Sequence, residues 1–153
     1  MHIEIEQLPA LRVGAVRHVG PYTQVGKAFE RLGALAGPAG LFQMPDAVML
    51  GIYHDDPQTT PNEQLRADAA VVVKEGTRLP DGLTERVIPA GRYARATHVG
   101  AYDGLPRAWA EFGASLGSGG YSVGSGPGLE IYRNDMARTP QDELRTDLYM
   151  PLD

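Results

Sequence analysis

Two matching phrases, LGIY at residues 50–53 and LEIY at residues 129–132, differ at a position where chemistry is possible. Gly51 in the first phrase corresponds to Glu130 in the second. Strand periodicity places Glu130 and Tyr132 on one face. A carboxylate beside a tyrosine, in a strand suited to burial, is a candidate anchor for a cation, because the ring adds cation–π and stacking contacts. The alternative is a solvent-facing Glu130 paired with an arginine.

Aromatic residues are more frequent in the second half of the chain. When the halves are aligned, Trp109 stands in place of Phe29, and Tyr149 stands in place of Ala70. The second half is therefore enriched in aromatic residues around Glu130. Core filling is the simpler explanation, because an aromatic residue at helical spacing more often packs in a core than against a ligand.

Other chemical motifs are weak. The segment GYSVG (120–124) matches a nucleophile elbow with Ser122 as nucleophile, but that motif needs a strand before it and a helix after it, and Gly-Pro-Gly follows here. The segment HDD (54–56) precedes a proline, where Asp side chains typically bond backbone amides rather than a metal. Cysteine is absent, and no two histidines have ligand spacing. We expect neither a metal nor a cofactor. The histidines are His2, His18, His54 and His98.

The chain repeats itself. HVGPY (18–22) returns as HVGAY (98–102), and IYHDDPQTTPNEQLRAD (52–68) returns as IYRNDMARTPQDELRTD (131–147). Two blocks in the same order at offsets of 80 and 79 indicate a duplication. We interpret the HVG phrase as a corner: a strand ends, a glycine turns, and an aromatic residue opens a helix. His18 and His98 are then structural.

Each half is predicted as strand–helix–strand–strand. Apolar residues recur at steps of 4, 3 and 4 in both predicted helices, which gives each a single apolar face. We predict an α+β fold in which the tandem units form one antiparallel sheet with both helices on one face. Residues 1–153 form one domain, with repeat halves at about 1–75 and 82–153. The helical faces are Val25, Phe29, Leu32 and Ala36, and Leu105, Trp109, Phe112 and Leu116; the expected strands are 11–19, 47–53, 65–73, one within 84–99, 129–134 and 144–152.

The direction of Glu130 depends on which side of its strand meets the helices. If Leu129 and Ile131 face the helices, Glu130 and Tyr132 look toward the opposite side or into the seam between the halves. Arg66 with Asp68, and Arg145 with Asp147, lie two residues apart on a strand, which is typical of cross-strand charge pairs.

Composition narrows the function classes. The net charge is −5 and the basic residues do not cluster, so direct nucleic-acid binding is not expected. No stretch approaches the ~20 apolar residues of a membrane span. The N-terminus alternates apolar and charged residues, unlike a signal peptide. We expect a cytoplasmic protein without a membrane partner.

These residues resemble the GyrI-like family, which includes the DNA gyrase inhibitory protein and the effector-binding domains of AraC- and MerR-type transcription regulators. The similarity covers nearly the whole chain and rests on VGPY, the LEIY strand, the closing ELRTDLYMPL and the loop Y-x-D-x-P…T-P-x-E-x-L-R-x-D. The chain begins at the first strand of such a domain, so it is similar to the stand-alone members.

The resemblance implies an aromatic pocket for amphipathic or cationic, drug-like molecules, with a glutamate at its centre. That glutamate matches Glu130, surrounded by Tyr22, Tyr102, Trp109, Tyr132 and Tyr149. The first expectation is a small-molecule binding protein. One alternative is an inhibitor of DNA gyrase that protects against gyrase-directed toxins. The other is a hydrolase of strained-ring electrophiles in which Glu130 acts as general base.

Overall fold

The structure, a computed structural model, describes residues 1–44 and 47–153. The chain forms two compact units. We call Pro9–Ala90 the N-terminal unit, and Met1–Leu8 together with Gly91–Asp153 the C-terminal unit. Each unit contains four antiparallel strands and one α-helix, so the predicted α+β class is confirmed.

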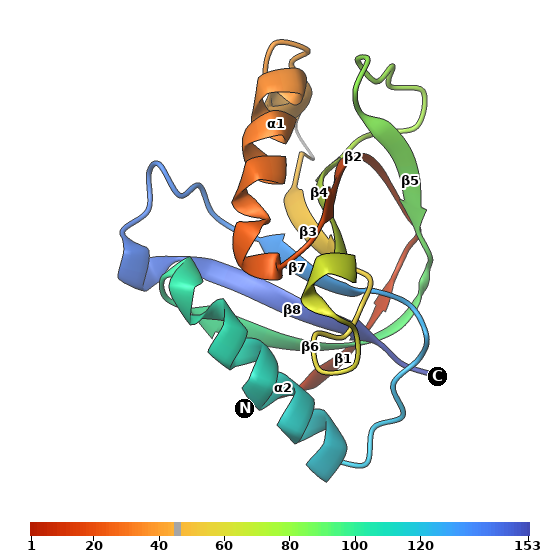
Figure 1. Cartoon of the computed structure of the whole chain (residues 1–153), viewed down its shortest axis with the longest axis vertical. Coiled ribbons are helices and arrows are strands. Elements are labelled where there is room, and N and C mark those ends of the chain that lie inside the picture. The colour runs from red at the N-terminus through yellow and green to blue at the C-terminus, as the bar shows by residue number, and fades with distance from the viewer. Residues whose placement is uncertain (45–46) are drawn as a thin grey trace. The chain divides into compact units, whose positions relative to one another are not determined.

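The N-terminal unit has the strand order β3-β4-β2-β5. Its helix α1 (Gly26–Ala36) packs on β2 and β4 (Figure 1). The core under α1 contains Ala28, Leu32 and Ala36 from the helix and Ala69 and Val71 from β4. The strands are β2 (Leu11–Val19), β3 (Met49–Tyr53), β4 (Arg66–Val72) and β5 (Thr84–Ile88), and the short 3-10 turns are η1 (Tyr22–Gln24), η2 (Leu41–Gln43) and η3 (Asn62–Gln64).

The C-terminal unit has the corresponding order β1-β6-β8-β7. Its helix α2 (Leu105–Ser118) buries Leu105, Phe112 and Leu116, so the predicted apolar face is confirmed, with Trp109 partly buried beside them. The sheet contributes Ala96 and Leu148 to this core. The strands are β1 (Glu4–Leu8), β6 (Gly91–Val99), β7 (Gly128–Tyr132) and β8 (Arg145–Pro151), and the 3-10 turns are η4 (Tyr102–Gly104) and η5 (Gln141–Glu143).

The structure has two strands, β1 and β5, that were not among the six strands expected from the sequence. Strand β1 leads along the chain into β2 but pairs with β6, and β5 leads into β6 but pairs with β2. Each unit therefore takes an edge strand from the opposite repeat half. The N-terminal alternation of apolar and charged residues fits β1, which is short and largely exposed, as edge strands often are. The duplication itself stays a prediction.

The repeated HVG phrase forms the same corner in both units. Gly20 and Gly100 have φ values of 130° and 136°, a region that only glycine adopts readily. The Nε2 of His18 donates to the carbonyl oxygen of Pro21 at 2.9 Å, and His98 donates likewise to Ala101 at 3.0 Å. The predicted structural role of both histidines is confirmed.

We expect Gly20→Ala to lower the free energy of unfolding by about 1–3 kcal/mol, because alanine is strained at this φ. Gly33→Ala is the matched control: it lies within α1 with nothing within 4 Å of the added Cβ, so it should raise stability by about 1 kcal/mol. Urea unfolding followed by circular dichroism measures both changes. Equal effects of the two substitutions would contradict the role of the corner.

Candidate functional site

The register of β7 on β8 decides which way Glu130 points. Glu130 lies opposite Leu148, and Leu148 belongs to the core under α2. Directly paired residues share a face, so Glu130 is on the helix-covered side of the sheet. Of the two orientations left open by the sequence, the structure has the one in which Glu130, and not Leu129 and Ile131, faces the helix. All of Gly128, Leu129, Glu130 and Ile131 are buried, so hydrophobicity could not distinguish the two faces.

The Glu130 carboxylate is buried and held by two aromatic side chains. Glu130 is 5 % exposed, so the alternative in which Glu130 faces solvent is wrong. The indole Nε1 of Trp109 donates to Oε2 at 2.6 Å, and the hydroxyl of Tyr132 donates to Oε1 at 2.8 Å. Both donors are neutral groups. They orient the carboxyl group and bring no positive charge to it.

Trp109 reaches Glu130 because the backbone of β7 is bare at Gly128. A Cβ built on Gly128 would lie 3.1 Å from the indole Cη2 and 3.5 Å from Cζ3. The corresponding position in the N-terminal unit is Met49, where the helix carries Phe29 instead of tryptophan. Trp109, Gly128 and Glu130 therefore occur together in the C-terminal unit, and their counterparts in the N-terminal unit all differ. Gly128 was missed from the sequence, although the Met49 to Gly128 difference was visible in the aligned halves.

Tyr102 completes an aromatic group beside Glu130. Its ring centroid lies 5.3 Å from that of Tyr132, with the planes inclined by 53°. Burial raises the pKa of Tyr102, and the negative charges of Asp135 and Glu130 raise it further. The Tyr102 hydroxyl is therefore protonated at neutral pH and can act as a hydrogen-bond donor.

Tyr149 lies on the other face of the sheet. It pairs with Leu129, is fully buried, and accepts a hydrogen bond from Arg133 Nη2 at 2.8 Å. Its hydroxyl donates to Glu6 Oε2 at 3.3 Å. Of the predicted residues, the structure thus groups Trp109, Tyr102 and Tyr132 around Glu130 and places Tyr149 in a different polar network.

Tyr22 lies in the N-terminal unit, where its hydroxyl is bonded to backbone groups. Its hydroxyl donates to the carbonyl oxygen of Arg66 at 2.8 Å and accepts from the amide of Asp55 at 3.1 Å. Its ring meets Tyr53 edge-on at 4.9 Å. These bonds fasten the helix corner to the loop that follows β3.

Thr146 is a polar residue that the sequence analysis missed. It is fully buried opposite Tyr132, so it lies on the same face as Glu130 and one diagonal step from it. Within the described residues its hydroxyl has no hydrogen-bond partner. The aligned position in the N-terminal unit is Ala67, so the difference between LRAD and LRTD was the available signal.

Neither the GYSVG segment nor the HDD segment forms the nucleophile or metal site considered for it. Ser122 donates to Asp153 Oδ2 at 3.0 Å from an irregular segment that no helix follows, so it is not a nucleophile elbow. Asp56 accepts from the amide of Gln58 at 2.8 Å, as expected for a turn. In the parts of the chain that the structure describes, no three His, Asp or Glu side chains converge as for a metal, and no helix has the length and apolar character to cross a membrane.

A family model described as the GyrI-like small molecule binding domain matches residues 1–153. The chain belongs to the GyrI-like family. It is 34% identical over 137 residues to a DNA gyrase inhibitor of Yersinia enterocolitica, covering 86% of this chain and 85% of that protein.

Solved structures share the fold of this GyrI-like domain. The EcmrR C-terminal domain matches with a TM-score of 0.82 at 20% identity, over 99% of this chain and 97% of that one. SAV2435 bound to tetraphenylphosphonium matches with a TM-score of 0.76 at 16% identity, over 100% of this chain and 94% of that one. At such identities the likeness concerns the fold alone.

The substitution Gly128→Ala tests whether the indole of Trp109 packs against the bare backbone at Gly128. The added methyl group would lie 3.1 Å from the ring and 3.6 Å from Met150 Cε, so the indole, which packs against the core under α2, has to shift. We expect a shifted emission maximum of Trp109, the single tryptophan, and a stability loss of about 1–3 kcal/mol. Gly113→Ala, on α2 with open space around its Cβ, is the control. Unchanged emission from the Gly128 variant would contradict the arrangement.

Proposed function

We propose that this GyrI-like domain binds amphipathic cations, with Glu130 as the charged anchor and Trp109, Tyr132 and Tyr102 as ring contacts. The observation that carries the proposal is a carboxylate 5 % exposed whose two oxygens each accept a hydrogen bond from a neutral aromatic side chain. Hydrogen bonds from neutral donors fix the direction of the carboxylate. These two bonds bring no positive charge to the carboxylate, and in a largely apolar setting a cation beside it would be attracted strongly.

The energetics favour a cation over a neutral molecule of the same shape. Removing a carboxylate from water costs several kcal/mol, and a bound cation recovers part of that cost through its Coulomb attraction. Aromatic faces near the charge add about 0.5–2 kcal/mol for each good cation–π contact. A neutral ligand would gain only the apolar contacts. The buried hydroxyl of Thr146, on the same face, supports a second polar contact to the ligand.

Tetraphenylphosphonium is a suitable probe, since SAV2435, which has this fold, was solved with it. It combines one delocalised positive charge with four phenyl rings. Triphenylphosphine oxide is similar in its rings but has no net charge. Triphenylphosphine oxide has three phenyl rings and a polar P=O group, so the comparison shows whether phenyl rings without a net charge are enough for binding.

Glu130→Gln should weaken tetraphenylphosphonium binding by about tenfold or more, because the amide keeps the shape and removes the charge. Quenching of Trp109 fluorescence during a titration gives the affinity. Glu111→Gln, on the exposed side of α2, is the matched control and should bind as the wild type does. The wild type should also prefer the cation to triphenylphosphine oxide. Unchanged affinity of the Glu130 variant, or equal binding of both compounds, would refute the proposal.

A second function is inhibition of DNA gyrase. It is supported by the name and the 34% identity of the Yersinia enterocolitica relative, which this chain matches over most of its length. A protein of net charge −5 is repelled by DNA phosphates, so inhibition would act through contact with the enzyme rather than the DNA.

A supercoiling assay with purified gyrase and relaxed plasmid tests this second function. We expect loss of supercoiled product as the protein is added, at a salt concentration where gyrase alone is fully active. Glu130→Gln is informative here too: inhibition through a protein surface should persist in this variant, whereas cation binding should fall. Full supercoiling activity at a large molar excess of protein would rule the function out for the gyrase tested.

A further inference from the structure

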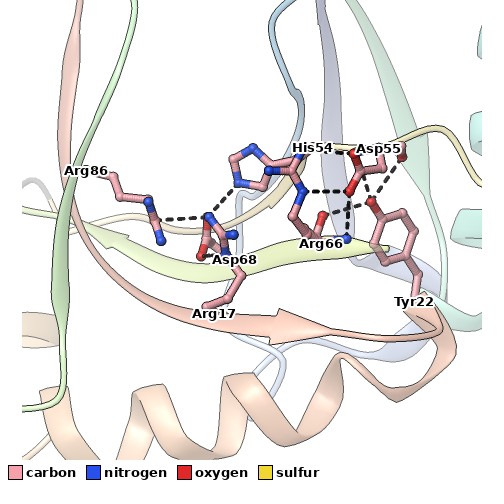
Figure 2. A network of polar contacts seen from close by, with 7 residues as sticks. All are labelled: Arg17, Tyr22, His54, Asp55, Arg66, Asp68 and Arg86. Carbon is pink, nitrogen blue, oxygen red and sulfur yellow. Dashed lines mark hydrogen bonds and ion pairs between the residues drawn. The ribbon is translucent and has the colours of Figure 1, made fainter. Parts of the chain in front are cut away.

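Each unit buries an aspartate on the sheet face away from its helix. In the N-terminal unit this residue is Asp68 on β4, fully buried. Arg17 donates to it from Nε at 2.9 Å, and His54 Nε2 lies 2.6 Å from its Oδ2. Arg86 Nε forms an ion pair with the same Oδ2 at 3.1 Å (Figure 2). One carboxylate therefore gathers three nitrogen-bearing side chains from β2, β5 and the end of β3.

The aligned aspartate of the C-terminal unit, Asp147, has a differently charged environment. Arg133 Nε donates to it at 2.6 Å, and Arg95 Nη1 lies 3.8 Å away. Arg95 also pairs with Glu6 and Glu4 of β1. Three carboxylates thus meet two arginines, and this group carries an excess of one negative charge.

The difference in net charge between the groups around Asp68 and Asp147 arises at aligned positions of the two repeat halves. Arg86 on edge strand β5 corresponds to Glu6 on edge strand β1. In the N-terminal unit, one carboxylate therefore meets two arginines and a histidine, which leaves an excess positive charge even with His54 neutral. Neighbouring ion pairs do not cancel it, because Asp55 is matched by Arg66 and Glu85 is matched by Arg12.

Asp68 is ionised at neutral pH, so this charge count holds. Burial alone would raise the pKa of Asp68, but hydrogen bonds from His54 and Arg17 and the charges of Arg17 and Arg86 outweigh it and lower that pKa. Guanidinium groups stay protonated at any working pH. The cluster is therefore cationic under ordinary conditions.

Arg86 has hydrogen-bonding capacity that Asp68 does not use. A guanidinium carries five N–H donors. The buried Nε of Arg86 lies 3.1 Å from Asp68 Oδ2 but makes no well-formed hydrogen bond within the described residues. The side chains of Arg17 and Arg86 are 31% and 32% exposed, so solutes can reach them.

We propose that Arg17, Arg86 and His54 of the N-terminal unit form a binding site for a small oxyanion, a phosphate or carboxylate group. Asp68 holds the three side chains in place, and the solvent-accessible parts of the Arg17 and Arg86 guanidinium groups would meet the anion. Guanidinium forks match the paired oxygens of such groups, which makes arginine the favoured side chain for them. The site includes none of the residues around Glu130, so anion binding here and cation binding at Glu130 can be tested independently.

Inorganic phosphate is the probe, and the thermal midpoint of the full chain is the first readout. Sodium chloride of equal ionic strength serves as reference, because salts also act through screening and general exclusion. The wild type should show a saturating stabilisation by millimolar phosphate over chloride. Arg86→Gln should weaken the apparent affinity by about tenfold. Arg78→Gln, which removes an exposed charge from the same unit, should leave it unchanged. Equal responses of all three proteins would overturn the site.

Chemical-shift mapping on the wild type decides the matter even where a variant fails to fold. Phosphate should move the side-chain nitrogen signals of His54 and the Nε signals of Arg17 and Arg86 along one binding curve. Sodium acetate, titrated in parallel, distinguishes a site for carboxylates from one selective for phosphate. Binding of either anion at these signals supports the proposal. If neither anion moves them, the proposal is wrong.

Discussion

The cost of burying carboxylates governs the polar architecture of both units. Glu130, Asp68 and Asp147 are each at most 5 % exposed, and an uncompensated buried charge costs several kcal/mol. Each carboxylate must therefore collect donors, and the donors come from different elements. In the N-terminal unit the donors to Asp68 tie β4 to β2, β5 and the end of β3. Removing this carboxylate would leave Arg17 and Arg86 facing each other without a counter-charge.

The same backbone plan carries two different interiors under its helices. Beneath α1 the aligned positions hold Gly51 and Ala67, and the core there is apolar. Beneath α2 they hold Glu130 and Thr146. The change is coupled, since an indole can reach Glu130 only where β7 lacks a side chain at Gly128. One unit therefore keeps a structural core, and the other converts the equivalent space into a polar group lined with rings.

Local pattern was enough to predict the helices, the central strands, the corners and the contrast at Glu130. Each rests on short-range periodicity or on comparison of the two halves. The face of Glu130 was not predictable, because β7 is buried on both sides and its direction follows from the pairing with β8. The edge strands β1 and β5 were missed for a related reason: each pairs with a strand of the opposite half. The group around Asp68 depends on that pairing, since Arg86 comes from β5.

Each unit takes its edge strand from the opposite repeat half, and the charged residues of that strand affect the net charge of the unit's polar group. Within the N-terminal unit β4 and β2 are the central strands, and within the C-terminal unit β6 and β8 are. The sign of the excess charge on the sheet face away from each helix follows from Arg86 on β5 and Glu6 on β1. Strand alternation places Glu130 on one face and Asp147, with Arg133 and Arg95, on the other. The arginines that compensate Asp147 are thus directed away from Glu130. The fold can in this way keep a structural charge network and a buried carboxyl group bonded to aromatic side chains on the same pair of strands, because the pleat separates them.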